Sequence, residues 1–150
     1  MTTTRATIND AAAILDLQRL AYQSEAARYD DYAIPPLTET LAELRAQFGS
    51  RTFLVAVEEG CIVGSVRGHL QGATCHVERL IVSPAFQRRG IGTELLKRIE
   101  SEFPTARRFE LFTGHRSDGN IRLYERLGYR SFRQERVSEK LTLVFMEKGR

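Results

Sequence analysis

One continuous stretch, residues 80–93 (LIVSPAFQRRGIGT), constrains the fold more than any other part of the chain. Its apolar start, Leu80–Val82, is typical of a buried strand. The glycines at 90 and 92, with two arginines before them, predict a tight basic turn that opens a helix. A helix start leaves backbone N–H groups without partners and carries roughly half a positive charge. Strand, glycine turn and helix start together predict a site for phosphate groups.

The remaining segments alternate between helical and extended patterns. Apolar residues at helical spacing predict helices over about 9–22, 38–48, 90–103 and 120–127. Runs rich in β-branched and aromatic residues predict strands near 4–7, 52–57, 62–67, 74–82, 108–113, 129–137 and 141–147. The polar segment 23–36 is expected to be a long loop of the kind that often carries function. A helix between strands 74–82 and 108–113 implies one parallel pair in a mostly antiparallel sheet.

Length and composition predict a single globular domain over residues 1–150. The chain is 42% hydrophobic and 27% charged, which is ordinary for a domain with one core. No segment is apolar enough for a membrane span or a secretion signal, so we expect a cytoplasmic protein without a membrane partner. The two cysteines lack metal-ligand spacing, so reduced thiols and no metal are expected. A net charge of +3 without a basic run argues against a nucleic-acid partner.

The spacing Gln87-x-x-Gly90-x-Gly92 resembles the acetyl-CoA signature of the GNAT N-acetyltransferase superfamily. A dinucleotide fingerprint would need a third glycine, and a P-loop would need Gly-Lys-Ser/Thr. The resemblance implies an α/β (α+β) fold whose mixed, mostly antiparallel central sheet is flanked by about four helices. It also implies acetyl-CoA as the co-substrate. The residues that it assigns to the acetyl-pantetheine end and the diphosphate are Leu80, Ile81, Val82, Gln87, Arg88, Arg89, Gly90, Ile91, Gly92 and Thr93.

A second motif, residues 117–129 (SDGNIRLYERLGY), is similar to another block of the same family. Asn120 and Tyr124 lie one helical turn apart and so share a helix face. The resemblance gives Asn120 a contact with the pantetheine arm and makes the Tyr124 hydroxyl the general acid for the thiolate. From spacing alone, Tyr124 could equally be a core aromatic and Asn120 a residue at the start of a helix.

Amine acetylation also needs a neutral amine, although a lysine-like amine has a pKa of about 10.4. Glu78 is the first candidate base because its strand parity matches Leu80 and Val82, which predicts the same face of the sheet unless a bulge intervenes. His76, two residues earlier, is the second. The alternatives are a strand-edge carboxylate paired with an arginine and a half-exposed strand histidine. The resemblance also implies that the backbone amide of Val82 faces the carbonyl oxygen of the acetyl thioester.

The function expected from these residues is transfer of an acetyl group from acetyl-CoA to a primary amine by direct attack in a ternary complex. A small amine or an amino-acid-like molecule is preferred as acceptor because no peptide-docking segment is evident. Acetylation of a protein lysine or N-terminus and a non-catalytic acyl-CoA sensor remain alternatives. The resemblance places the acceptor between the first two helices, segment 23–36 and the last two strands. It also allows a homodimer.

Overall fold

The computed structural model describes residues 1–150 and contains one seven-stranded sheet with the order β1-β2-β3-β4-β5-β7-β6. All neighbouring strands are antiparallel except β4 and β5. The single parallel pair predicted from the sequence is therefore confirmed. The strands are β1 (Thr2–Arg5), β2 (Thr52–Glu58), β3 (Cys61–Gln71), β4 (Thr74–Val82), β5 (Arg108–Gly114), β6 (Arg130–Arg136) and β7 (Thr142–Gly149).

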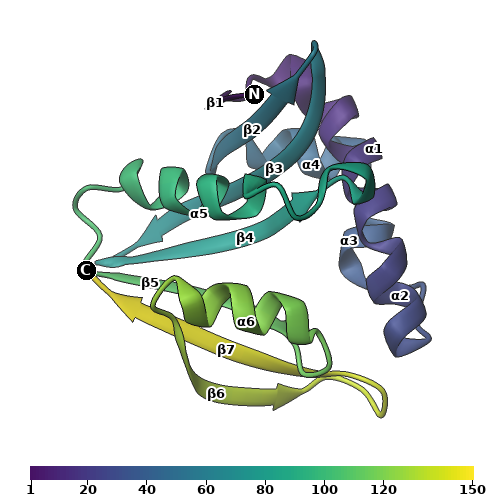
Figure 1. Ribbon diagram of the computed structural model, residues 1–150, viewed down its shortest axis with the longest axis vertical. Coiled ribbons are helices and arrows are strands. Elements are labelled where there is room, and N and C mark those ends of the chain that lie inside the picture. Colours follow the sequence, from purple (N-terminus) through teal and green to yellow (C-terminus); the bar gives the residue numbers. More distant parts are fainter.

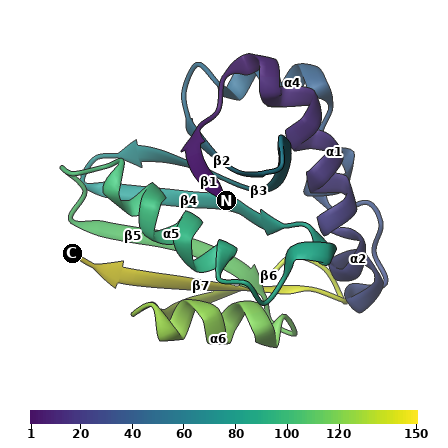
Figure 2. The same ribbon diagram turned by 45° about the horizontal axis from the view of Figure 1, so that its top comes forward.

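The helices lie on both faces of this sheet (Figures 1 and 2). Helices α5 and α6 cover one face, where they share the larger core with β2–β5 and β7. Helices α1 and α4 pack on the other face, against β2. The helices are α1 (Ala11–Ala21), α2 (Gln23–Tyr29), α3 (Pro35–Thr38), α4 (Leu41–Gln47), α5 (Ile91–Ser101) and α6 (Asp118–Arg126), with short 3₁₀ turns at Ile8–Asp10 and Pro84–Phe86. None of these helices has the length and apolar character needed to cross a membrane.

Segment 23–36 is not the long loop that its polarity predicts. Residues 23–29 form α2, and α3 begins at Pro35. Ala26 and Tyr29, three residues apart, are buried on one face of α2, and this contact stabilises a helix that is too short to form by itself. Asp30, with a left-handed φ of 49°, ends the helix. This helix and the single turn α3 are the helical segments beyond the four that the sequence predicts.

Strands β4 and β5 pair over only three residues and then separate. The pairs are Thr74 with Arg108, Cys75 with Phe109 and His76 with Glu110. Beyond them the sheet opens like a V, with its closed end near the C-terminus (Figure 1). The strands therefore splay as the family resemblance implies.

A β-bulge in β4 lies where the opening begins. Ser65 of β3 faces Ile81 and Arg67 faces Glu78, so that two residues of β4, Arg79 and Leu80, lie opposite one residue of β3. Arg79 has a φ of 53°. A bulge of this kind bends its strand and increases the local twist, which carries the end of β4 away from β5.

Candidate functional site

A cavity of about 780 Å³ lies at the open end of the V. This volume suits a small-molecule or cofactor site. One wall is the bulged end of β4 with the turn that leads into α5, and the opposite wall is the end of β5 with α6. The third side is formed by the α1–α2 junction, residues 34–36 and the β6–β7 hairpin.

The glycine turn places a bare helix start in this cavity. Gly90 is the N-cap of α5 and has a φ of 80°, a conformation that glycine adopts without strain. The first bond at this helix start runs from the Glu94 N–H to the Gly90 carbonyl at 3.0 Å, which leaves the N–H groups of residues 91–93 without backbone partners. A ligand diphosphate fits these donors because a helix start binds anions.

All the residues assigned to acetyl-CoA line the cavity, with the exception of Arg89. The Arg89 guanidinium carbon lies 4.8 Å from the centre of the Phe86 ring, and its Nη1 is 3.8 Å from Glu58 Oε1. The Arg89 side chain therefore packs over Phe86 toward β2, and its contact with the diphosphate stays a prediction. Arg88 lines the cavity.

The backbone of β4 offers a free donor at the other end of the same wall. The Ser83 N–H donates to the Val63 carbonyl at 2.8 Å, and Gly64 lies directly opposite Val82. Because hydrogen-bonded and non-bonded pairs alternate along an antiparallel ladder, the Val82 N–H points away from β3. It faces the gap that β5 has left.

Asn120 and Tyr124 both reach the cavity from one face of α6. Asn120 Nδ2 donates to Thr113 Oγ1 at 3.3 Å, which orients its amide beside β5. Burial raises the pKa of the Tyr124 hydroxyl, and the nearby Tyr22 and Glu25 raise it further. Tyr124 is therefore protonated at neutral pH and can donate a proton into the cavity.

The bulge reverses the face predicted for Glu78 and His76. Before the bulge, Cys75 and Val77 point into the core beneath α5, whereas after it Leu80 and Val82 do so. Glu78 and His76 therefore face the other side of the sheet. The parity argument, which put them on the face of Leu80 and Val82, is wrong because of the extra residue in the strand.

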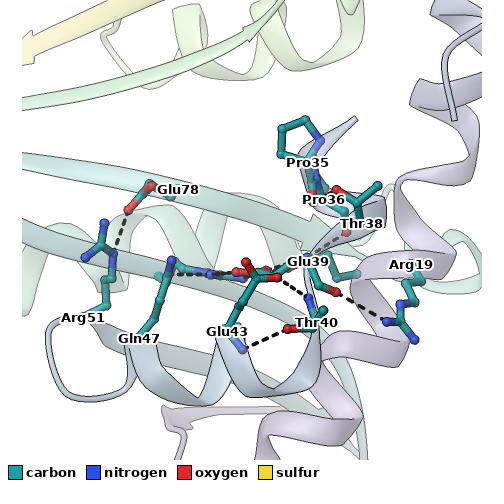
Figure 3. A network of polar contacts seen from close by, with 12 residues as sticks. Arg19, Pro35, Pro36, Thr38, Glu39, Thr40, Glu43, Gln47, Arg51 and Glu78 are labelled. Atoms are coloured by element: carbon teal, nitrogen blue, oxygen red, sulfur yellow. Dashed lines mark hydrogen bonds and ion pairs between the residues drawn. The ribbon is translucent and has the colours of Figure 1, made fainter. Parts of the chain in front are cut away.

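Glu78 nevertheless lines the cavity, and two basic side chains hold its carboxylate. Glu78 Oε1 is 3.3 Å from Arg51 Nε (Figure 3) and 3.1 Å from His69 Nδ1. Burial and the neighbouring Arg51 lower the pKa of His69, although Glu78 opposes this shift. At neutral pH His69 is thus a neutral partner of the carboxylate.

His76 does not line the cavity. Its ring stacks on His69 with centres 5.1 Å apart, and its Nδ1 is 3.7 Å from Glu110 Oε2. Of the two bases predicted from the sequence, the structure brings only Glu78 to the site.

The wall formed by α2 carries polar groups that the sequence did not single out as a unit. Tyr22, Glu25 and Tyr29 line the cavity, whereas Asp30, Asp31 and Tyr32 of the same acidic segment do not. The spacing of Tyr22, Glu25, Ala26 and Tyr29 is helical and is the signal that could have identified this wall.

Hydrogen bonds tie this wall to the start of α6. The Tyr29 hydroxyl lies 2.8 Å from Ser117 Oγ and accepts from the Arg116 N–H at 2.8 Å. Ser117 Oγ in turn lies 2.6 Å from Glu25 Oε2. His115, in the loop before α6, lies outside the cavity lining and accepts from the Thr142 N–H at 3.0 Å.

A second network behind the site, centred on Arg67, was not foreseen. Arg67 is buried and donates to both carboxylate oxygens of Glu39 at 3.1 Å and to Gln18 Oε1 at 2.7 Å. Figure 3 shows Glu39 with Gln47, which also accepts from Arg67, at 2.6 Å. Burial acts to raise the pKa of Glu39, but the bonds from Arg67 and Gln18 outweigh it and the pKa is lowered.

This network joins four parts of the fold. It connects α1, the segment before α4, α4 itself and β3. No group of three or more His, Cys, Asp or Glu side chains is arranged to hold a metal ion.

Comparisons with known proteins agree with this geometry. Residues 12–129 match the profile of the acetyltransferase (GNAT) family. A mycothiol acetyltransferase of Geodermatophilus obscurus is 33% identical over 123 residues, which are 79% of this chain and 37% of that protein. The chain thus spans little more than a third of the length of this relative.

Solved structures share the whole fold at low sequence identity. The PaiA N-acetyltransferase of Thermoplasma acidophilum, in complex with coenzyme A, has a TM-score of 0.80 at 16% identity and covers 100% of both chains. YncA of Salmonella typhimurium, with acetyl-CoA, has a TM-score of 0.77 at 23% identity over 99% of this chain and 93% of that chain. Because the family profile covers most of its length, the chain belongs to the acetyltransferase (GNAT) family.

Proposed function

We propose that this protein is an N-acetyltransferase that moves an acetyl group from acetyl-CoA directly to a primary amine bound in the same cavity. One observation carries the proposal: the unpaired N–H groups of residues 91–93 and the free N–H of Val82 open into a single cavity of about 780 Å³. A donor site for a diphosphate and a donor for a carbonyl oxygen are thus fixed on one rigid wall.

The bound acetyl-CoA would supply the activated acetyl thioester. In the proposal, Arg88 and the N–H groups of residues 91–93 hold its diphosphate, where the charge and the unpaired donors act together. The exposed backbone edge of β4 at residues 80–82 binds the pantetheine arm as an added strand would. Asn120 faces this arm from the opposite wall.

The chemical step needs a donor at the carbonyl oxygen, a base and an acid. The Val82 N–H stabilises the negative charge that grows on the carbonyl oxygen. As the new N–C bond forms and the C–S bond breaks, Glu78 takes the proton that the amine loses. The Tyr124 hydroxyl gives a proton to the departing thiolate, so protons and charge balance with an amide and a free thiol as products.

The position of Glu78 supports one side for the entry of the acceptor. Its carboxylate lies on the face of the sheet opposite the side chains of Leu80 and Val82, toward α1 and α4. An amine that enters past Tyr22 and Glu25 on the α1–α2 wall therefore meets the base before it meets the acetyl group. A small amine suits this enclosed approach.

Calorimetric titration of acetyl-CoA tests the binding half of the proposal. We expect saturable heat with the natural chain. Three variants at Gly92 provide the comparison: Gly92→Ala, Gly92→Asn and Gly92→Asp. An aspartate in the first turn favours the helix but repels a diphosphate, so Gly92→Asp should bind at least tenfold more weakly than the isosteric Gly92→Asn. Equal affinities of these two variants would contradict a diphosphate at this turn.

Release of CoA in the presence of amines tests the catalytic half. Chromatography of free CoA is preferable to a thiol reagent because the exposed Cys61 would react as well. The panel should include amino acids, polyamines and peptides with free N-termini. Tight binding of acetyl-CoA without release of CoA by any amine would identify a non-catalytic sensor and overturn the enzymatic proposal.

A further inference from the structure

Arg79 is the one side chain with a buried nitrogen or oxygen atom that lacks a hydrogen-bond partner. That atom is its Nε, which is closed off from solvent. Leaving a buried donor unpaired costs about 1–3 kcal/mol, and more for a charged group. The residue also has a left-handed φ of 53° within a strand, a conformation that costs a further ~1–3 kcal/mol and tends to occur at functional sites. Two unfavourable features thus coincide at one residue of the cavity wall.

The other charged residues that line the cavity do not share this situation. Glu25 is bonded to Arg28 and Ser117, and Glu78 to Arg51 and His69. The remaining arginines of the lining, Arg88 and Arg126, are exposed, so water satisfies their donors. Arg79 is the only residue of the cavity lining whose side chain has an unmet buried donor.

The charge of Arg79 acts on groups at the α1–α2 side of the cavity. Burial raises the pKa of Tyr22 at the α1–α2 junction, and the positive charge of Arg79 is the largest effect that opposes this rise. The same charge reaches Glu39. Glu39 does not neutralise it, because Arg67 and Gln18 already bind both carboxylate oxygens and Arg79 has no acidic partner within salt-bridge distance.

We infer that Arg79 binds a carboxylate of the acceptor, so that the substrate is a small molecule that carries both an amine and a carboxylate. This inference rests on the proposed acetyl transfer and names its substrate class. The Nη1–Nη2 end of a guanidinium matches the two oxygens of a carboxylate and forms paired, charge-assisted bonds. Unlike Nε, the two Nη groups of Arg79 are not closed off from solvent, and they make no hydrogen bond within the protein, so a ligand carboxylate can reach them.

The acidic residues of the cavity favour a carboxylate over a dianion. Glu25 and Glu78 lie on the same cavity and would repel a phosphate with two charges more strongly than a carboxylate with one. They would attract the ammonium group of the same substrate and guide it toward Glu78. Arg79 and the two glutamates thus present opposite charges to the two ends of an amino acid.

The opposite charges of Arg79 and the two glutamates would let the site distinguish an aminocarboxylate from other amines. A polyamine has no group to pair with Arg79 and would place a cation beside it. A protein N-terminus has its α-carboxyl locked in a peptide bond, and so it offers only a neutral carbonyl to the guanidinium. Arg79 would therefore act as a specificity-determining residue.

The test is a set of matched substrates. Each of the twenty common L-amino acids is compared with its carboxamide and its decarboxylated amine by chromatography of released CoA. For the best amino acid we expect a kcat/KM at least 100-fold above those of its two partners. Arg79→Gln should lower kcat/KM for the acid by a similar factor but leave the carboxamide unchanged within about threefold, and Arg79→Lys should restore part of the loss.

Two measurements separate a binding role from a structural one. The affinity for acetyl-CoA should be unchanged in both variants, and thermal unfolding should show that they are folded. Arg45→Gln, on the exposed side of α4, is the matched control and should behave like the natural chain. The inference is overturned if acid and carboxamide react equally, if Arg79→Gln slows both alike, or if no aminocarboxylate is acetylated. The proposed function itself would fail in a different way: the protein would not bind acetyl-CoA, or it would release no CoA with any amine.

Discussion

At the scale of single residues, Tyr124 is the side chain whose proposed role is simplest to isolate. Its hydroxyl is buried and protonated at neutral pH. Tyr124→Phe removes one oxygen and leaves the ring in place. Loss of general acid catalysis costs about 10²–10⁴-fold, so we expect kcat to fall by at least 100-fold with an unchanged affinity for acetyl-CoA, measured by steady-state kinetics and calorimetry.

Tyr129→Phe is the matched control for that variant. Tyr129 is buried in the same core, but its hydroxyl donates to Glu100 Oε2 at 2.7 Å and it lies outside the cavity. We expect this variant to lose stability and to keep its kcat. Equal kcat losses in the two variants would show that the effect of Tyr124→Phe comes from packing.

Glu78→Gln tests the base through the pH dependence of turnover. With Glu78 in place, a bound ammonium group can pass its proton to the carboxylate, so the natural chain can turn over well below the pKa of the free amine. Without the base, kcat/KM should rise about tenfold per pH unit up to that pKa, as expected when only the small fraction of neutral amine reacts. A variant with the same pH profile as the natural chain would exclude Glu78.

The limits of sequence-based prediction are clear at these same residues. The glycine spacing predicted the helix start at residues 90–92, where Gly90 has the positive φ that favours glycine; its binding of a diphosphate stays a prediction. The parity argument failed at Glu78, because one extra residue in β4 reverses the faces and nothing in the local sequence marks the bulge. The proposed role of Arg79 was not predicted, for a different reason. Its importance depends on partners that it lacks, which only the three-dimensional structure reveals.

At the scale of elements, the close packing of α5 on β3 depends on Gly64. A Cβ atom at Gly64 would lie 2.9 Å from Leu95 Cδ1 and 3.0 Å from Ile91 Cγ2. Gly64→Ala should therefore destabilise the fold by about 1–3 kcal/mol through overpacking, as measured by urea unfolding. Because α5 carries the diphosphate turn, the affinity for acetyl-CoA should weaken as well.

Gly119→Ala provides the opposite case. A Cβ at Gly119, in the first turn of α6, would meet nothing within 4 Å. Alanine should therefore raise the stability by about 0.4–1 kcal/mol by restricting the unfolded chain. If Gly64→Ala stabilised the fold as Gly119→Ala does, α5 would be able to move away from β3. That result would contradict the tight contact at Gly64.

Helix α2 shows why elements differ in how readily they are predicted. Long helices such as α5 have an apolar stripe that repeats over several turns and were recognised. Helix α2 has seven residues and buries only Ala26 and Tyr29. Its stability comes from the bonds of Tyr29 and Glu25 to the α6 start, contacts across some 90 positions of the chain that no local pattern contains.

At the scale of the whole molecule, the order of helices and strands was enough to predict the mixed sheet and its single parallel pair. The buried group of Arg67, Glu39 and Gln18 was not predictable, since it is assembled from three distant segments. Removing one partner of a buried ion pair leaves a charge without compensation and costs about 3–5 kcal/mol. The network therefore ties α1 and the segment before α4 to the sheet.

This network gives the stability of the fold a defined dependence on acid. Despite the opposing effect of burial, hydrogen bonds lower the folded-state pKa of Glu39 below its ordinary 4.5. As the pH falls, Glu39 in the unfolded chain therefore takes up a proton before Glu39 in the folded chain does. Its contribution to stability is complete above about pH 4.5 and is lost as the pH falls through the folded-state pKa.

Glu39→Gln should be less stable than the natural chain at pH 7, and this difference in stability should shrink below pH 4.5. Urea unfolding of both proteins between pH 7 and pH 3 measures this difference, with the exposed Glu139→Gln as control. A deficit that stays constant over the whole range would show that the Glu39 carboxylate charge does not stabilise the fold.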